Sequence, residues 1–179
     1  IKIIIGPVFN ENLIYLDELA NITFLSLTNK NDNFSKNIIN AGINATSQLN
    51  TIKKFLELKK IKNTIFLTPD VNYKNEIKKA ISVSKIKIIK NYTYNADPTK
   101  LTQQIEEITR YGIRKQNLED EIIRLEKSNQ SNKERLIDKL KKRDTLGSVK
   151  FDSIIIADFD ESLKSVTTSL LYTDISPKN

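Results

Sequence analysis

The chain contains no cysteine, histidine, methionine or tryptophan, and only four of its 179 residues are glycine. Without Cys or His it has neither a thiolate nucleophile nor an imidazole base, and it lacks the usual zinc ligands. The absence of Cys also excludes disulfide bonds and leaves the redox compartment open. Because no nucleophile–base pair is visible, we disfavour a hydrolase or transferase and expect a protein that is not an enzyme and needs no cofactor.

Two further absences limit the class of protein. None of the four glycines falls in a phosphate-binding or dinucleotide-binding pattern, which argues against nucleotide chemistry. No apolar run approaches the ~20 residues that span a bilayer. The sequence begins at Ile1 inside an apolar run and has no Met, so we expect an interior piece of a longer protein, whose leader would lie outside it.

The formal net charge is +7, and its distribution matters more than its size. A basic balance can indicate nucleic acid or an anionic membrane surface as partner. Here the lysines are scattered, and they accompany many Asn and Ile residues, which share AT-rich codons. We attribute the charge to base composition and expect no nucleic-acid partner, since a basic patch is missing.

Apolar runs alternate with helical patterns along most of the chain. Continuous apolar runs predict strands, and apolar residues three or four apart predict helices. The alternation predicts an α/β fold of parallel sheets with helices on both faces. We expect the first two strands in one sheet and the last three in another. The predicted strands are Ile1–Ile5, Ile22–Leu27, Thr64–Leu67, Ile86–Tyr92 and Phe151–Ala157. The predicted helices are 10–20, 48–59 capped by Thr46 or Ser47, 73–83, one opened by Asp97-Pro98, and 162–172.

Polar loops follow the first two predicted strands. Asn10 lies in the segment after the first strand, and Ser26 and Thr28 end the second, before a polar loop over Thr28–Asn33. Ligands of parallel sheets usually sit at the carboxyl ends of the strands, so these side chains are candidates for binding a small polar ligand. The alternative is ordinary turn chemistry, in which the same side chains bond their own backbone.

An acidic cluster of Asp158, Asp160 and Glu161 follows the last predicted strand. Such a cluster could bind a hard cation. With Phe159 between the acids and no supporting Gly, we favour capping of the next helix, where carboxylates stabilise the positive end of the dipole.

The segment Arg114–Arg143 interrupts the alternation with dense charge of both signs. Leu118, Ile122 and Leu125 lie on one narrow helical stripe, and a polar break at Ser128–Asn132 separates a second half with Leu136 and Leu140. The pairs Asp120–Arg124 and Asp138–Lys142 are favourable at a spacing of four. We predict an exposed helical hairpin, or one long helix extended from Leu101, that projects from the sheet. It is either a solvated spacer or a docking arm for another protein.

The order of these motifs resembles the type I periplasmic-binding-protein fold. Its first lobe is suggested by Ile3-Ile4-Ile5-Gly6-Pro7-Val8-Phe9, a helix, and Phe24-Leu25-Ser26-Leu27-Thr28-Asn29. Gly42 and the following helix look like the crossing to the second lobe, which Thr64–Pro69 and Tyr73 would begin. The resemblance implies that 1–42 belong to lobe one and 43–179, including the arm 114–143, to lobe two.

The later motifs resemble one branch of that fold, the penicillin-binding-protein activators of alphaproteobacteria. They are the charged arm, Thr145-Leu146-Gly147, Phe151-Asp152-Ser153-Ile154-Ile155 and Tyr172-Thr173-Asp174-Ile175-Ser176-Pro177. The resemblance implies a periplasmic protein, often held at the outer membrane by a lipid anchor, here outside this chain. Its relatives stimulate peptidoglycan synthases, the penicillin-binding proteins, by contact.

The alternative within the same fold is a solute receptor of an ABC importer for branched-chain amino acids or amides, with two lobes closing on the ligand. In that case we expect the ligand to be bound by Asn10, Ser26, Thr28, Tyr73 and Asp158. The receptors normally have Gly after the residue at Tyr73, whereas Lys74 follows here.

Overall fold

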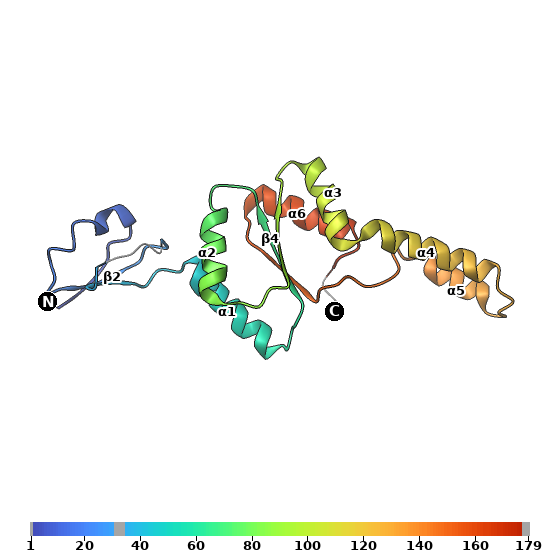
Figure 1. The fold of residues 1–179 in the computed structure, drawn as a ribbon, viewed down its shortest axis with the longest axis horizontal. Helices are drawn as coiled ribbons and strands as arrows, with labels where there is room; N and C mark the ends of the chain where they lie inside the picture. Colours follow the sequence, from blue (N-terminus) through green and yellow to red (C-terminus); the bar gives the residue numbers. More distant parts are fainter. Residues whose placement is uncertain (1, 31–34, 177–179) are drawn as a thin grey trace. The chain divides into compact units, whose positions relative to one another are not determined.

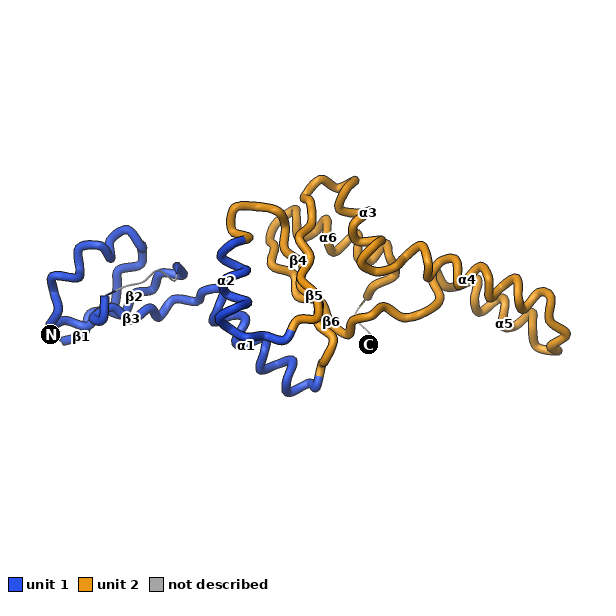
Figure 2. The backbone as a smooth tube through the Cα atoms, viewed as in Figure 1, with its two compact units in different colours: residues 1–60, 75–87 blue, residues 61–74, 88–179 orange. Residues whose placement is uncertain are grey.

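A computed structural model of the chain describes residues 2–30 and 35–176. These residues form an α/β protein with two parallel sheets of three strands each and six α-helices (Figure 1). The α/β class and the division into two parallel sheets agree with the sequence prediction. The chain divides into two compact units (Figure 2). Unit 1 comprises 1–60 and 75–87, and unit 2 comprises 61–74 and 88–179. Whether the units correspond to lobes divided at residue 42 stays a prediction.

Unit 1 contains a sheet in the order β1 (Ile3–Ile5), β2 (Thr23–Ser26), β3 (Ile38–Asn40). The parallel pairing of the first two predicted strands is confirmed, with Ile4 opposite Phe24. The third strand was not predicted, because it offers only two apolar residues between asparagines. Of the predicted strand and loop segments here, Ile1 and residues 31–33 lie outside the described residues.

The helix predicted over residues 10–20 is wrong beyond its first turn. Only a 3₁₀ helix, η1 (Asn10–Leu13), forms. After it, Leu16, Leu19 and Ile22 each donate their N–H to the carbonyl three residues earlier, so the segment is a series of tight turns. Leucines three apart fit this three-residue period as well as an α-helix. Leu13 packs with Phe24 and Ile38 in a small core.

Unit 2 is built on a sheet with β4 (Thr64–Pro69) between β5 (Lys90–Tyr94) and β6 (Ser153–Ile156), all parallel. The prediction that the last three strands share a second sheet is confirmed. Strand β5 begins later than predicted, since its ladder with β4 starts at Lys90 opposite Ile65. Every residue of β4 is buried, which matches a central parallel strand.

Two helices cover one face of this sheet. Helix α3 (Pro98–Thr109) begins at Asp97, whose carboxylate accepts the Thr99 and Lys100 N–H groups, as the Asp-Pro pair predicts. Helix α6 (Asp160–Tyr172) runs beside α3 (Figure 1). The buried core between sheet and helices consists of Ile65, Leu67, Tyr94, Leu101, Ile105, Val166 and Leu170. Each Leu or Ile buried there contributes about 1.5–3 kcal/mol. Helices on both faces stay a prediction.

Two further helices precede and follow strand β4 in the sequence. Helix α1 (Ala45–Leu58) starts before the predicted Thr46 or Ser47 cap. Asn44 is the cap, and its side chain and that of Ser47 bond each other's backbone N–H in a capping box. Helix α2 (Lys74–Ser84) agrees within one residue with the prediction, and the Lys53 ammonium of α1 donates to the Ser84 carbonyl at 3.2 Å.

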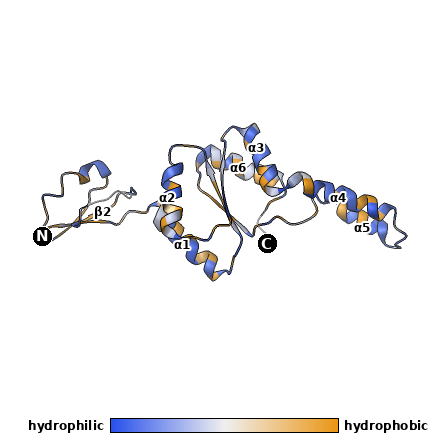
Figure 3. Cartoon of the chain, in the orientation of Figure 1, coloured by the Kyte–Doolittle hydropathy of each residue, from blue (hydrophilic) through white to orange (hydrophobic). Residues whose placement is uncertain are grey.

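The predicted helical hairpin is confirmed. Helix α4 (Tyr111–Glu126) follows α3, and α5 (Lys133–Leu140) folds back along α4. Hydrophobic and hydrophilic residues alternate along both helices (Figure 3), and Leu118, Leu125 and Ile137 are buried. Arg124 pairs with Glu121 at 2.7 Å rather than with the predicted Asp120, which accepts a bond from Gln116. Among the described residues, no helix is long and apolar enough to cross a membrane.

Candidate functional site

The carboxyl edge of the second sheet gathers three polar side chains, which we call the edge cluster: Tyr73, Tyr94 and Asp158. The Tyr73 hydroxyl donates to Asp158 Oδ1 at 3.1 Å, and the Tyr94 hydroxyl donates to Asp158 Oδ2. The N–H of Phe159 donates to Asp158 Oδ1 at 2.9 Å. Both oxygens of one carboxylate are therefore held in fixed directions.

The sheet topology brings the cluster together from positions far apart in sequence. Tyr94 is the last residue of β5, Tyr73 lies four residues after β4, and Asp158 lies two residues after β6. Because the three strands are parallel neighbours, their carboxyl ends meet at one edge, where α/β sheets usually bind ligands. The site is thus a direct product of the strand order.

Burial and the carboxylate suppress ionisation of both phenols. Removal from water, the hydrogen bond to Asp158 and the negative charge of Asp158, in that order of size, together raise the pKa of Tyr73 from its usual 10 to about 12. The same causes raise the pKa of Tyr94 more strongly, against a smaller lowering by the Ser162 hydroxyl. Both tyrosines therefore remain neutral hydrogen-bond donors at any physiological pH.

The loop after Asp158 adds an apolar wall. The Phe159 ring lies 5.5 Å from the Tyr73 ring, centroid to centroid, although Phe159 remains largely exposed. The next residue, Asp160, has a φ of +53°, in the left-handed region that non-glycine residues seldom adopt. Such backbone is found where the surroundings fix it, and it often accompanies a functional site.

The edge cluster has hydrogen-bonding groups that can bind a ligand. Two neutral tyrosines and a carboxylate that already accepts three hydrogen bonds do not form a nucleophile–base pair. The carboxylate and phenolic oxygens can instead accept hydrogen bonds from an ammonium or amide group that displaces one phenol. The described residues hold no group of three or more acidic, Cys or His side chains suited to a metal ion.

The acidic residues after β6 depart from the predicted cap. Phe159 is the N-cap of α6, and no side chain makes a capping bond there. Asp160 and Glu161 do lie in the first turn, where the helix dipole favours them. Asp158 instead accepts hydrogen bonds from Tyr73 and Tyr94. This distinction could not be predicted, because it depends on two tyrosines that lie 64 and 85 residues earlier in the sequence.

Of the five residues predicted to bind ligand, the structure brings Tyr73 and Asp158 together. Sequence reasoning missed Tyr94, Phe159 and Ser162. A signal for Tyr94 existed, since it closes the Lys90–Tyr94 strand just before the Asp97-Pro98 helix start. The predicted strand ended two residues too early, and so the tyrosine was taken for a loop residue.

The other three candidates, Asn10, Ser26 and Thr28, belong to unit 1. Ser26 is fully buried, donates to the Pro7 carbonyl at 3.2 Å and accepts from the Thr28 N–H at 3.3 Å. Thr28 in turn accepts from the Lys30 N–H at 3.2 Å. The bonds of Ser26 and Thr28 match the turn-chemistry alternative. A cleft shared by all five residues stays a prediction.

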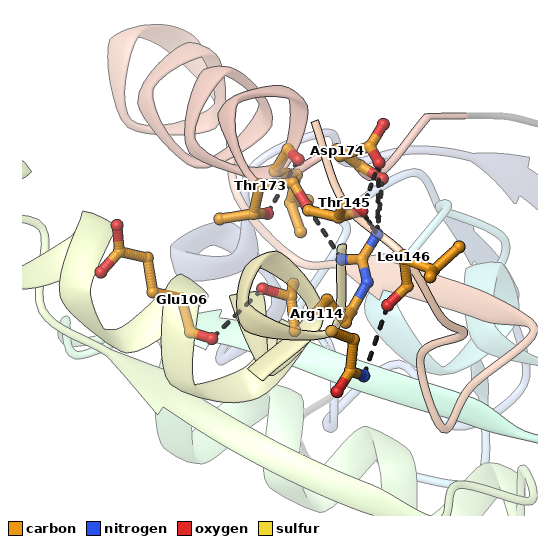
Figure 4. A network of polar contacts seen from close by, with 9 residues as sticks. Glu106, Arg114, Thr145, Leu146, Thr173 and Asp174 are labelled. Carbon is orange, nitrogen blue, oxygen red and sulfur yellow. Dashed lines mark hydrogen bonds and ion pairs between the residues drawn. The ribbon is translucent and has the colours of Figure 1, made fainter. Parts of the chain in front are cut away.

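A second polar cluster closes the base of the hairpin, and we call it the root cluster: Arg114, Thr145, Thr173 and Asp174 (Figure 4). Arg114 is only 6% exposed. Its Nη1 donates to the Thr173 carbonyl at 3.0 Å, and its Nη2 donates to Thr145 Oγ1 at 2.7 Å and to the Asp174 carbonyl at 3.3 Å. The predicted exposed arm therefore begins after Arg114, because this residue anchors the hairpin to the body of unit 2.

No protein-family model matches the chain, and no curated protein matches it.

Proposed function

We propose that the chain is part of a non-enzymatic binding protein of the type I periplasmic-binding-protein kind, which activates a peptidoglycan synthase by contact. In this proposal it works in the periplasm, and any lipid anchor at the outer membrane lies outside these residues. The observation that supports it best is the helical hairpin inserted between α3 and β6. A small domain gains little stability from such an insertion, which favours a role in contacting a partner.

The hairpin offers a charged rather than an apolar contact surface. Residues 133–143 carry six Lys or Arg residues against two acids, whereas α4 carries four acids against Arg114, Lys115 and Arg124. Exposed charges of this kind contribute little to stability but raise the rate and specificity of association with a complementary surface. The basic α5 side therefore suits an acidic surface on the synthase.

A pull-down with a penicillin-binding protein of the synthase class tests the proposal. Replacing 119–141 by a short Gly/Ser linker removes the exposed hairpin but keeps the Arg114 contacts, so we expect a nearly unchanged thermal midpoint and loss of capture. Replacing all of 114–143 should instead lower the midpoint, because Arg114 is buried and bonded.

Reversing charges tests whether capture depends on the hairpin surface or only on the net charge of the chain. Lys139→Glu with Lys141→Glu, at the end of α5 and directly after it, should weaken capture. Lys78→Glu with Lys79→Glu, exposed on α2, makes the same change in net charge and should leave capture intact. Undiminished capture by the linker variant would make the hairpin a spacer and remove the docking proposal.

The second candidate function is the solute receptor for amino acids or amides. The edge cluster favours it, because a carboxylate flanked by two phenols and an aromatic ring can recognise an ammonium or amide group. Calorimetry against a panel of branched-chain amino acids and amides should then give saturable heat that Asp158→Asn abolishes and that the exposed Asp120→Asn preserves. Absence of heat across the panel would exclude this candidate.

A further inference from the structure

A hollow of about 350 Å³ lies at the root of the hairpin, within unit 2. Three cations and two carboxylates line it together with a threonine: Arg114, Lys142, Arg143, Asp144, Asp174 and Thr145. We infer that this hollow binds a small oxyanion, a carboxylate or a phosphate group. The inference does not depend on the proposed function, and the hollow is distinct from the edge cluster.

The guanidinium of Arg114 is already fixed in place. Backbone carbonyls of Thr173 and Asp174 and the Thr145 hydroxyl hold its Nη atoms (Figure 4). The Arg114 carbonyl accepts the Leu146 N–H at 2.9 Å. Because these contacts pre-organise the side chain, binding a ligand there costs little rotamer entropy.

This guanidinium is incompletely satisfied. Its Nε–H is buried, and no described residue accepts a hydrogen bond from it. The carboxylate nearest to it, Asp174 Oδ2, lies 3.5 Å from Nη2, is 42% exposed and also accepts the Thr145 hydroxyl. A buried cation normally has a close carboxylate or phosphate partner and bonds for all its donors. An oxyanion in the hollow would supply a further negative partner for the guanidinium.

The end of the hairpin supplies the remaining charge. Lys142 and Arg143, which follow α5, are exposed and line the same hollow as the buried Arg114. Their flexible side chains can contact an anion that is bound to the rigid Arg114 guanidinium. The volume suits a phosphate or a small carboxylate-bearing molecule, being at the lower end of the range for ligand pockets.

Calorimetric titration of the full chain with inorganic phosphate and, separately, with acetate tests the inference. We expect saturable binding of at least one anion, and the variant Lys142→Ala with Arg143→Ala should weaken it about tenfold or more, since charge-assisted bonds are lost. The matched variant Lys139→Ala with Lys141→Ala removes the same charge beside the hollow and should bind as the unchanged chain does. Binding of phosphate alone identifies a phosphoryl ligand, and binding of acetate alone identifies a carboxylate.

Three results would overturn the inference: no saturable binding of either anion, undiminished binding by the Lys142/Arg143 variant, or equal weakening by both double variants, which would reflect bulk charge only. The variant Arg114→Lys provides a second test, because it retains the positive charge and removes the planar hydrogen-bond donors. If circular dichroism shows it folded, it should lose most of the binding. If it is unfolded, the two exposed double variants decide the question.

Discussion

The two sheets have the same number of strands and the same parallel pairing, yet their surroundings differ. In unit 2 every residue of β4 is buried, and a seven-residue core joins the sheet to α3 and α6. In unit 1 every residue of β1 is exposed, and the buried core consists of three side chains. Parallel strands therefore owe their stability to the helices packed on them, and not to the ladder alone.

The carboxyl edges of the two sheets differ in the same sense. In unit 1 the polar side chains of Ser26 and Thr28 bond the backbone of their own loop or of the loop after β1. In unit 2 Tyr73, Tyr94 and Asp158 bond one another across three strands. Polar residues at similar positions thus fold a turn in one sheet and build a cluster in the other.

The largest effect expected from this comparison is on the core of unit 2. Leu67 is fully buried, so Leu67→Ala should lower the free energy of unfolding by about 2–5 kcal/mol. Ile5, which is 73% exposed in β1, is the control, and Ile5→Ala should stay within about 0.5 kcal/mol. Amide hydrogen exchange along β4 and β1 measures both. Equal losses in the two sheets would break the comparison.

A smaller effect is expected at the two edges. Tyr94→Phe removes a buried bond to a carboxylate and should cost about 1.5–3 kcal/mol, whereas Ser26→Ala removes neutral bonds and should cost about 0.5–1.5 kcal/mol. Urea denaturation gives both values. Combining Tyr94→Phe with Asp158→Asn in a double-mutant cycle should reveal a coupling energy. Additive losses would mean that the edge cluster does not act as a unit.

A third expected effect depends on alkaline pH. The pKa of Tyr73 is raised from 10 to about 12 in the folded protein, so between these values the folded chain holds a proton that the unfolded chain has released. Stability contributed by this group is complete below pH 10 and is lost as pH rises towards 12. Tyr73→Phe should flatten that decline in denaturation midpoints measured from pH 9 to 12. An unchanged slope would show that lysines or other tyrosines control it.

The smallest effect is expected on the hairpin surface. The Glu121–Arg124 pair is exposed, and the guanidinium lowers the pKa of Glu121. Solvent and salt screen such pairs, so Glu121→Gln should leave the thermal midpoint unchanged at physiological salt. A clear fall in the midpoint would mean that the hairpin carries more of the stability of unit 2 than its burial suggests.

The sequence predicted most elements whose signal is local. Apolar runs placed five strands and their division between two sheets, and Asp97-Pro98 placed the start of α3. It failed where the signal was ambiguous or short. Leucines at a spacing of three fitted both an α-helix and a series of turns over 10–20, and Ile38–Asn40 was too brief to distinguish from a loop. Neither error changed the fold class.

The candidate site was predicted only in part for a different reason. Tyr73 was chosen from the resemblance to solute receptors, and Asp158 because it follows the last predicted strand. Their hydrogen bonds in one cluster with Tyr94 depend on β4 lying between β5 and β6. The order of strands in a sheet cannot be predicted from any single segment of the sequence. Arg114 was likewise taken for an exposed arm residue, because its partners at 145, 173 and 174 are remote in sequence.

The long sequence separation between Arg114 and its partners has a consequence for folding during synthesis on the ribosome. Helices α4 and α5 contact each other within one short stretch of chain, so the hairpin can form as soon as Leu140 leaves the ribosome. The Arg114 guanidinium must wait for Thr173 and Asp174, which are 59 and 60 residues further along. A nascent chain that stalls after Leu140 and before Thr173 would contain the folded hairpin without the contacts of Arg114 to Thr173 and Asp174. We expect proteases to cut such a chain around Arg114 until Asp174 has emerged.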